Sequence, residues 1–378
     1  MQPGKVALAA AVGAEADFAD PGFSAAIIEW QQQHGRHALP WQNTSDAYRI
    51  WLSEIMLQQT QVAAVIPYYQ RFLLRFPDVA ALAAAPAEDV MAHWSGLGYY
   101  SRARNLHRCA QRVLQEYGGK FPCEPALLAE LPGIGRSTAA AIAAFSCGAR
   151  AAILDGNVKR VFARVFGIDG YPGSKPVEAL MWRRAVALLP AQNIQAYTQG
   201  LMDLGATLCS RSKPSCERCP LQARCVALAS GRVAELPQRK PASVRPEKRL
   251  AMLVVLDRDQ VLLLQRPDSG IWGGLLSLPE LDPALLAPLA AQPHQPHPAL
   301  AQALAPFGSI ADCEPLPPFL HGFTHFKLQV APYRIGLKQR HAMVGQLPHV
   351  WYPTDQLAQA PLPAPVKKLL LQIVGEGS

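Results

Sequence analysis

The chain has 378 residues, of which half are hydrophobic and 17% charged, and its formal net charge is +8 at pH 7. This length and composition are sufficient for two or three globular domains with proper cores. No apolar run reaches the length of a membrane span, which excludes a helical membrane protein, and the positive charge favours a polyanionic partner such as nucleic acid.

The first part of the chain predicts a tail followed by an all-α domain. Residues 1–22 contain only a short Ala-rich apolar stretch after Lys5, so we expect a disordered extension rather than a signal peptide. Over residues 23–225, apolar residues recur at helical spacing in segments separated by short Gly or Pro breaks. We therefore predict a helical domain over this range.

The second part predicts a linker and an α+β domain. Residues 226–247 are polar, basic and Pro-bearing, as in an interdomain linker. Beyond them the apolar period becomes 2, which is typical of strands. Strand-like runs lie at 249–257, 260–266, 272–281, 321–335 and 349–353. A Pro/His loop at 288–298 and a last amphipathic helix at 366–374 complete the predicted domain over 248–374.

Residues 131–161 combine a glycine turn with a carboxylate. Gly133 and Gly135 lie in the turn LPGIG, where backbone N–H groups can approach an anion closely, and the helix that follows adds positive potential. This predicts a phosphate grip, with an ordinary helical hairpin as the alternative. Asp155 follows in the same stretch, just before the basic helix of Lys159. A carboxylate beside a phosphate grip indicates a chemical role.

Glu54 is a candidate proton donor. On a helix it shares a face with Ile50, Trp51 and Leu57, so we expect a buried or half-buried carboxyl group with a raised pKa. The alternative is a structural salt bridge, for example with Arg49.

Two further stretches suit nucleic-acid contacts. The amides of Gln58, Gln59 and Gln61 surround Thr60 at a helix end, where they can pair with base edges or merely cap the helix. Residues 96–104 combine glycines, tyrosines and arginines, which suits base stacking and phosphate contact. The alternative for this stretch is a helical corner with tyrosine in the core.

The cysteines predict one metal site. The chain has 8 cysteines, and four of them follow the pattern Cys209-x6-Cys216-x2-Cys219-x5-Cys225. Zinc sites usually use two C-x2-C pairs, whereas these wider arms favour a [4Fe–4S] cluster. The other four have apolar neighbours and predict buried thiols in a reducing compartment rather than a disulfide framework. They are Cys109, Cys123, Cys147 and Cys313.

Together, the LPGIG hairpin, Asp155 in LDGNVKRV and the cysteine loop at 209–225 resemble the helix-hairpin-helix DNA glycosylases of the endonuclease III type. Within that superfamily, the stretches SEIMLQQTQV, GLGYYSRARNL and FTHF are similar to the adenine DNA glycosylase family. The resemblance covers about residues 24–373. It implies a multidomain protein with an all-α glycosylase core, an iron–sulfur loop and a Nudix-like C-terminal domain.

The resemblance implies a base-excision repair enzyme that hydrolyses the N-glycosidic bond of adenine mispaired with 8-oxoguanine or guanine in double-stranded DNA. It further implies a monomer of the bacterial cytoplasm, associated with the nucleoid through DNA. Glu54 would protonate N7 of the flipped adenine, and Asp155 would stabilise the oxocarbenium-like sugar, as two carboxyl groups do in glycoside hydrolysis. Asn157 and Gln199 would order the carboxylates and water.

The resemblance also places residues at the DNA. Gln59 and Tyr99 would wedge into the duplex around 8-oxoguanine, while Gly133 and Gly135 would grip a phosphate and Lys159 would lie near the sugar. Further implied contacts are Gln58, Thr60, Leu97 and Gly98. A loop of the C-terminal domain would read the 8-oxoguanine base through Phe323, Thr324 and His325.

Two departures from related enzymes limit the expected activity. Ser137 stands where strand-cutting members of the superfamily have a lysine nucleophile, and serine cannot form an imine, so we expect a monofunctional glycosylase. After Gly274 and Glu280, the chain lacks the Glu-rich helix with which a Nudix hydrolase holds Mg²⁺. We therefore expect no nucleotide hydrolysis.

Two other functions stay open. An endonuclease III-like glycosylase/lyase is disfavoured by Ser137 and by the domain at 248–373. A non-catalytic DNA-binding iron–sulfur protein would make the presence of both Glu54 and Asp155 a coincidence.

Overall fold

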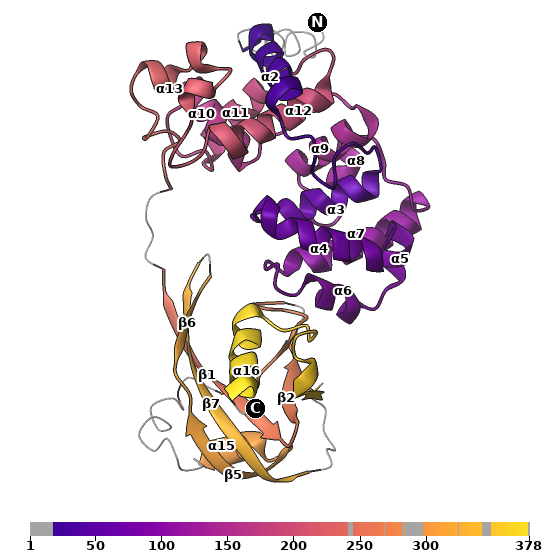
Figure 1. Ribbon diagram of the computed structural model, residues 1–378, viewed down its shortest axis with the longest axis vertical. Coiled ribbons are helices and arrows are strands. Elements are labelled where there is room, and N and C mark those ends of the chain that lie inside the picture. Colours follow the sequence, from indigo (N-terminus) through magenta and orange to yellow (C-terminus); the bar gives the residue numbers. More distant parts are fainter. Residues whose placement is uncertain are drawn as a thin grey trace, which may run out of the picture. The chain divides into compact units, whose positions relative to one another are not determined.

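The computed structural model describes residues 18–240, 245–267, 269–281, 284, 298–323, 325–341 and 349–376. The chain forms two compact units (Figure 1). The helical unit comprises Met1–Ala84 and Asn105–Ala242, and the sheet unit comprises Ala85–Arg104 and Ser243–Ser378.

The described part of the helical unit contains helices and no strands, which confirms the predicted all-α core. Its longer helices are α2 (Pro21–His34), α3 (Ala47–Leu57), α4 (Val62–Arg75), α5 (Val79–Ala84), α8 (Pro125–Ala129), α9 (Arg136–Cys147), α10 (Gly156–Val165), α11 (Lys175–Ala187) and α12 (Ile194–Asp203). Helix α7 (Ser101–Tyr117) begins in the segment assigned to the sheet unit. The unit ends in a π-helix, η1 (Leu204–Leu208), two 3-10 turns, η2 (Cys216–Arg218) and η3 (Gln222–Arg224), and α13 (Val226–Ala229).

Helix α10 illustrates how the sequence sets the packing of this unit. Asp155 is its N-cap, and the carboxylate accepts a hydrogen bond of 2.8 Å from the backbone N–H of Val158. Val158, Val161, Phe162 and Val165 then follow at spacings of three and four residues, and all are buried. They pack in one core with side chains of α2, α9, α11 and α12.

Two arginines of α10 fix this helix to the cysteine loop. The Arg160 guanidinium donates to the carbonyls of Cys209 and Gly205, each at 2.7 Å. Arg164 is only 3% exposed, and it donates to the carbonyls of Leu236 and Ser210 at 2.8 and 2.7 Å. Because carbonyl oxygens satisfy the buried guanidinium, these bonds hold α10 in place without a second charge.

The segment predicted as a linker is shorter in the structure. Residues 226–240 belong to the helical unit, where α13 buries Ala227 and the turn after it buries Leu236. A polar and basic segment can still pack on a domain, here because Ala227 and Leu236 are buried and the Leu236 carbonyl accepts a hydrogen bond from Arg164. Residues 241–244 lie outside the described residues, and β1 begins at Glu247.

The prediction of four buried thiols outside the metal loop holds for Cys109 and Cys313, which are buried and free. It is wrong for Cys123 and Cys147, which are exposed and form a disulfide bond. Apolar neighbours in the sequence did not reveal this exposure, because one cysteine precedes a short helix and the other ends a helix.

The sheet unit is built on one mixed sheet. Its central strands, β1 (Glu247–Asp257) and β7 (Lys327–Arg340), run parallel, with Glu247 opposite Lys327 and Leu256 opposite Gly336. The other strands pair antiparallel: β2 (Gln260–Gln265), β3 (Leu276–Ser277), β4 (Glu280–Leu281), β5 (Gly308–Pro315), β6 (Phe319–Gly322) and β8 (His349–Pro353). The main strand order is β3-β2-β1-β7-β5.

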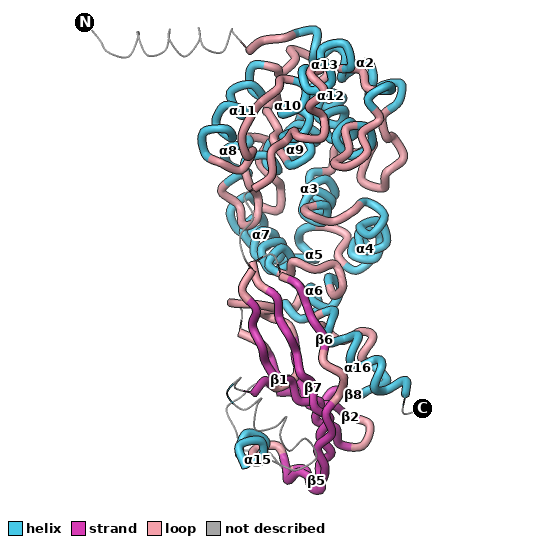
Figure 2. Tube along the Cα trace, turned by 90° about the vertical axis from the view of Figure 1, so that its left-hand side faces the viewer, coloured by secondary structure: helices cyan, strands magenta, loops and turns pink. Residues whose placement is uncertain are grey.

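Helices cover both faces of this sheet. Figure 2 shows α15 (Pro298–Leu304) and α16 (Ala364–Glu376) on opposite sides of it. Leu300 and Leu304 of α15 pack with Ala251 and Leu253 of β1. Double coverage explains why residues 250–255 are continuously buried instead of alternating.

The predicted strand over 272–281 is largely a turn. Gly270, Trp272 and Gly274 all have positive φ angles, which end an extended conformation, and only β3 and β4 remain as short strands in this region. By contrast, the strand-like runs predicted at 249–257 and 260–266 are present as β1 and β2, which pair antiparallel with Arg258 and Asp259 between them.

The segment 85–104 packs on the C-terminal part of the sheet unit. It contains α6 (Ala87–Trp94) and the glycine turn before α7. The hydroxyls of Ser95 and Tyr100 both donate to the carbonyl of Leu362, at 3.2 and 3.4 Å, and the Arg104 guanidinium donates to the carbonyl of Gly273.

Within the described ranges, no helix combines the length and apolarity needed to cross a membrane.

Candidate active site

A cleft of about 1360 Å³ opens in the helical unit. Its walls come from α3, α9, α10 and α12 and from the loops around residues 36–45 and 58–62. The cleft brings together most of the candidate residues of the helical domain. These are Glu54, Gln58, Gln59, Thr60, Ser137, Asp155, Asn157 and Gln199.

Glu54 is a half-buried side chain on the cleft side of α3. The helix is held at its start by Asp46, whose carboxylate accepts from the N–H groups of Tyr48 and Arg49. Burial raises the pKa of Glu54 to about 8, and the charge of nearby Asp155 adds to the shift. At neutral pH this carboxyl group is therefore largely protonated and can give up a proton.

Asp155 stands at the N-terminus of α10 in the same cleft. Burial raises its pKa, while the backbone N–H groups of Val158 and Asn157 and the charges of Arg160 and Lys159 oppose the rise. These donors stabilise the ionised form. Asn157 also lines the cleft, where its side-chain oxygen accepts from Arg160 at 2.8 Å.

Ser137 lies at the N-terminal end of α9 and lines the cleft. Its hydroxyl oxygen accepts a hydrogen bond of 2.9 Å from the backbone N–H of Leu154. Because Leu154 directly precedes Asp155, this bond holds the backbone that presents the carboxylate.

The end of α3 forms one rim of the cleft. Gln58 is the C-cap of α3, and its amide lies 3.5 Å from the Thr138 hydroxyl. Gln59 is exposed with a φ of 57°, in the left-handed region that few residues other than glycine adopt. Thr60 also lines the cleft.

Glycine occupies the two hairpin positions, 133 and 135, for different physical reasons. Gly133 has a φ of 81°, and a Cβ there would come within 2.8 Å of Asn105, so the fold itself requires glycine. Gly135 is the N-cap of α9, with a φ of −88°, and an added Cβ would meet no protein atom within 4 Å. The protein leaves the space beside Gly135 open.

Other predicted residues lie outside the cleft. Lys159 forms an ion pair of 2.6 Å with Glu178 of α11 and is absent from the cleft lining. In the sheet unit, Leu97 is buried, whereas Tyr99 is 47% exposed with a φ of 49° and Gly98 has a φ of 77°. Within the helical unit, Lys159 is therefore not placed with Glu54 in the cleft.

The predicted 8-oxoguanine loop connects β6 to β7. The Phe323 ring stacks on Phe326 at 4.6 Å and also contacts Trp272 and His321. His325 is exposed, and Thr324 lies outside the described residues. An exposed imidazole thus stands beside a packed aromatic cluster. Glu280, considered above as a Nudix residue, pairs with Arg266, and most of the segment after it lies outside the described residues.

One cleft feature has no signature in the sequence. Asp203 is fully buried, and its carboxylate accepts from the backbone and side chain of Arg36 at 2.8 and 2.7 Å and from Gln199 at 2.8 Å. Arg36 and Asp203 are 167 residues apart, so no local pattern indicates the pair. It anchors the loop after α2 and the Gln199 side chain in the cleft wall.

The four clustered cysteines line one small cavity with apolar side chains and Arg164. All four are half-buried free thiols. The Cys209 sulfur lies 3.4 Å from the Arg164 guanidinium, which can offset thiolate charge. Four cysteines facing one cavity are the donor set of an iron–sulfur or zinc site. Among the described side chains, however, none form a preassembled group of three or more metal ligands.

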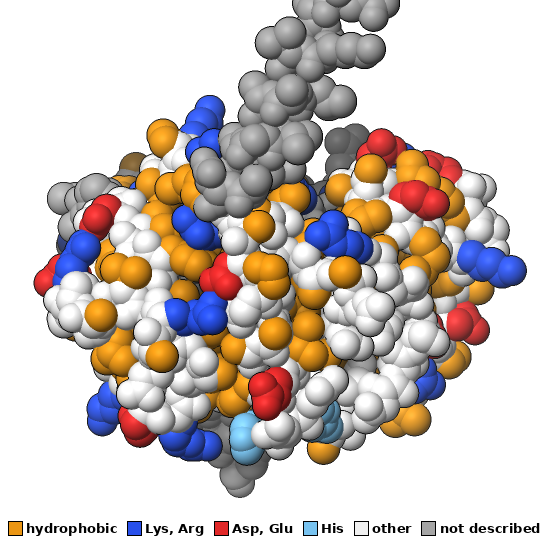
Figure 3. Space-filling model, turned by 90° about the horizontal axis from the view of Figure 1, so that it is seen from above, with side chains coloured by type: hydrophobic (Ala, Val, Ile, Leu, Met, Phe, Trp, Pro, Cys, Tyr) orange, Lys and Arg blue, Asp and Glu red, His pale blue; other side chains and the backbone are white. Residues whose placement is uncertain are grey.

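The basic excess of the chain is not concentrated at the end of the helical unit near α2. Figure 3 shows that Lys and Arg side chains are interspersed there with Asp and Glu and with scattered hydrophobic groups. The part of this face that Figure 3 leaves open to view, outside the grey residues, therefore has no continuous positive surface of the kind expected where DNA phosphates bind.

Known proteins resemble this chain over both units. The profile of the HhH-GPD superfamily base excision DNA repair proteins matches residues 52–185, and that of the NUDIX domain matches residues 251–372. An adenine DNA glycosylase of Buchnera aphidicola subsp. Acyrthosiphon pisum is 34% identical over 355 residues, covering 92% of this chain and 96% of that protein. An adenine DNA glycosylase of Mus musculus is 35% identical over 416 residues, covering 93% of this chain and 78% of that protein.

Among solved structures, a thermostable thymine-DNA glycosylase matches with a TM-score of 0.51 and 28% identity. The match covers 58% of this chain and 99% of that one, which is the extent expected for a helical core without the sheet unit.

The raised pKa of Glu54 predicts a pH-dependent stability. Folding favours the protonated carboxyl, so the resulting stabilisation is complete below the unfolded pKa and is lost as pH rises towards the folded value of about 8. Glu54→Gln cannot ionise and should gain stability relative to the wild type across this window, by at most ~1.4 kcal/mol per pH unit. Urea unfolding of both proteins at a series of pH values measures the difference. A difference that does not change with pH would show that Glu54 titrates normally.

Proposed function

We propose that this chain, which belongs to the adenine DNA glycosylase family of helix-hairpin-helix base-excision repair enzymes, removes adenine paired with 8-oxoguanine or guanine by hydrolysing its N-glycosidic bond. One observation carries the proposal: Glu54 and Asp155 line the same cleft, and hydrogen bonds and positive charges oppose the burial-raised pKa at Asp155 but not at Glu54. Glu54 can supply a proton at neutral pH, while hydrogen bonds support a negative charge on Asp155.

Glu54 acts as the general acid. Its pKa of about 8 keeps the carboxyl group protonated at pH 7. Because this pKa is close to neutral pH, the proton can still be transferred to a base nitrogen. Protonation of adenine at N7 lets the base leave as a neutral molecule with the electron pair of the glycosidic bond. The sugar is left with a positive charge at C1′.

Asp155 stabilises that positive sugar and supports the attack of water on C1′. Its position at the N-cap of α10 fixes the carboxylate before substrate arrives, so little reorganisation is needed during the reaction. Asn157 and Gln199 lie in the same cleft and are held by Arg160 and Asp203, which suits side chains that orient the carboxylate and the water.

The adenine must leave the base stack to reach this cleft. Gln58, Gln59 and Thr60 form the rim of the cleft where the duplex would be opened. In the sheet unit, the exposed Tyr99 would offer an aromatic surface to DNA. Gly135, beside which a Cβ would find open space, lets a DNA phosphate approach the N-terminus of α9. Gly133 supports the turn itself, and Lys159 supplies positive charge nearby.

The opposite base is read by the loop between β6 and β7. Phe323 offers an aromatic surface held by neighbouring rings, and His325 offers exposed ring nitrogens for hydrogen bonds to a base edge. Thr324 would add a hydroxyl.

Cys209, Cys216, Cys219 and Cys225 hold a [4Fe–4S] cluster. Their shared cavity and the neighbouring Arg164 fit a negatively charged centre, which the four thiolates would hold. A bound cluster would tie the four cysteines of this loop to one centre. Through the contacts of Arg160 with the carbonyls of Cys209 and Gly205, the same loop supports α10.

The general-acid role predicts a large effect of a small change. Glu54→Gln should slow adenine release from duplexes with adenine opposite 8-oxoguanine by ~10³-fold or more, about 4 kcal/mol of barrier. The measurement is single-turnover release of adenine. Glu116→Gln, which alters an exposed pair with Arg112, is the matched control and should react as the wild type does.

The same assay tests the choice of opposite base. Adenine should be released from pairs with 8-oxoguanine and guanine and retained opposite thymine. Equal release from all three duplexes would contradict the proposed mismatch specificity, and unchanged release by Glu54→Gln would remove this residue from the mechanism.

Ser137 predicts that the enzyme does not cut the strand. Ser137→Lys should form an imine with the sugar that borohydride traps, because its amine would stand in the cleft beside Asp155. Ser137→Ala also removes the hydrogen bond to Leu154 but supplies no amine, so it serves as the control. If Ser137→Lys produced no more trapped complex than Ser137→Ala, the serine at this position would not explain why the enzyme leaves the strand uncut.

The cysteine cavity predicts a brown protein with about four iron atoms per chain. Cys216→Ser should lose most of the iron, whereas Cys313→Ser changes a buried free thiol of the sheet unit and should keep it. Metal analysis of the purified proteins distinguishes an iron–sulfur cluster from a zinc site. A colourless wild type with one zinc ion would contradict the proposed cluster.

A further inference from the structure

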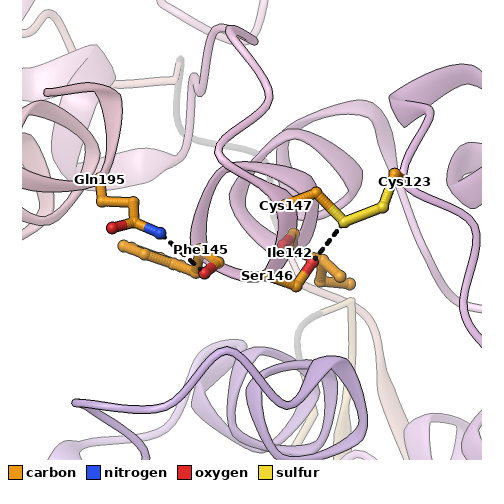
Figure 4. The surroundings of a disulfide bond; sticks show 6 residues. All are labelled: Cys123, Ile142, Phe145, Ser146, Cys147 and Gln195. Carbon is orange, nitrogen blue, oxygen red and sulfur yellow. Dashed lines mark hydrogen bonds between the residues drawn. A yellow bond between two sulfur atoms is a disulfide. The ribbon is translucent and has the colours of Figure 1, made fainter. Parts of the chain in front are cut away.

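The two exposed cysteines close the base of the helical hairpin. Cys123 lies two residues before Pro125, the first residue of α8, and Cys147 is the last residue of α9; their Cα atoms are 5.8 Å apart and their sulfurs are bonded (Figure 4). The residues between them contain α8, the glycine turn with Gly133 and Gly135, and α9. The bond therefore joins the two ends of the whole hairpin.

The Cys147 end of this hairpin also belongs to the cleft wall. Phe145 lines the cleft, and its carbonyl accepts a hydrogen bond of 3.0 Å from Gln195 at the start of α12 (Figure 4). The Ser146 hydroxyl lies 3.5 Å from the Cys147 sulfur and donates to the Ile142 carbonyl at 2.7 Å. A covalent bond at Cys147 thus acts directly beside residues that shape the cleft.

We propose that Cys123 and Cys147 are a reversible oxidation site for peroxides, and that the disulfide holds the hairpin closed. In a reducing compartment the pair is a dithiol. Both side chains are exposed, so a peroxide can reach them. The proposal does not depend on which base the enzyme removes.

The chemistry balances with one peroxide for each pair. One thiolate attacks a peroxide oxygen, the O–O bond breaks, and a sulfenic acid forms as hydroxide leaves. The second thiol attacks this sulfur, its proton is lost, and hydroxide is displaced as water. Two thiols and one hydrogen peroxide give one disulfide and two waters, so the sulfurs lose two electrons and the peroxide gains them. A thiol reductant reverses the bond.

The remaining isolated thiols are poor competitors. Cys109 is fully buried, and burial raises the pKa of its thiol to about 12, which leaves little thiolate to react. Cys313 is also buried. The exposed pair is therefore the preferred target outside the cysteine loop.

The disulfide should protect the hairpin from local opening. A crosslink removes open conformations of the segment it encloses, here one with a sequence separation of 24. We expect amide hydrogens of the α8–α9 peptides to exchange roughly tenfold more slowly in the oxidised protein than in the reduced one. The melting temperature of the helical unit should rise by about 5–10 °C.

The test uses the full-length, metal-loaded protein. Reduced wild type is treated with equimolar hydrogen peroxide, and peptide mapping follows the cysteines while visible absorbance reports on the metal centre. We expect one linked peptide joining Cys123 to Cys147, its loss on adding dithiothreitol, and slower exchange while it is present. Cys123→Ser and Cys147→Ser should form no link and exchange as the reduced wild type does, whereas Cys109→Ala should behave as the wild type.

Each other outcome overturns part of the proposal. Failure to form the link at a peroxide dose that leaves the metal centre intact would rule out the oxidation site. A link that dithiothreitol cannot reverse would rule out a switch. A link that forms without slowing exchange in the α8–α9 peptides would show that the disulfide does not hold the hairpin closed.

Discussion

The position of α10 is the constraint on which the candidate site depends. Asp155 caps this helix by accepting the N–H of Val158, and the helix is immobilised behind it by a buried apolar stripe and by the bonds of Arg160 and Arg164 to backbone carbonyls. Ser137 holds the preceding residue, Leu154, from the other side. The carboxylate is thus fixed by backbone contacts, and its negative charge needs no neutralising salt bridge that would compete with a positive sugar.

The same arrangement explains how two carboxyl groups share one cleft. Both are shielded from water, and an unrelieved pair of charges there would be costly. Burial raises the pKa of both groups, but backbone N–H groups and the charges of Arg160 and Lys159 oppose the rise at Asp155 only, so Glu54 is the group that retains its proton more readily. The two side chains are chemically similar, so their different surroundings account for the acid role of Glu54 and the anion role of Asp155. The Arg36–Asp203 pair keeps a third carboxylate out of this balance, because that charge is already paired within the wall.

Features encoded within a few residues could be predicted, and long-range ones could not. Helical spacing placed Glu54 on a half-buried face, and the glycine turn, the strand period and the cysteine spacing each depend on local order. The cleft depends on tertiary packing that brings Glu54 to Asp155, so only the family resemblance joined them. The Cys123–Cys147 bond and the left-handed Trp272 were missed because neighbouring residue types reveal neither exposure nor a reversed backbone.

Helix α9 links the two ends of this system mechanically. Its residues Ala139–Ala144 are all buried, so the helix packs closely along its length and has little freedom to bend. Its first turn carries Ser137 and follows Gly135, while its last turn carries Phe145 and Cys147. A constraint at Cys147 therefore acts on the whole helix rather than on one turn. Because a rigid helix moves as a unit, fixing its C-terminal end at Cys147 also restrains the hairpin turn and the Ser137–Leu154 hydrogen bond at its N-terminal end.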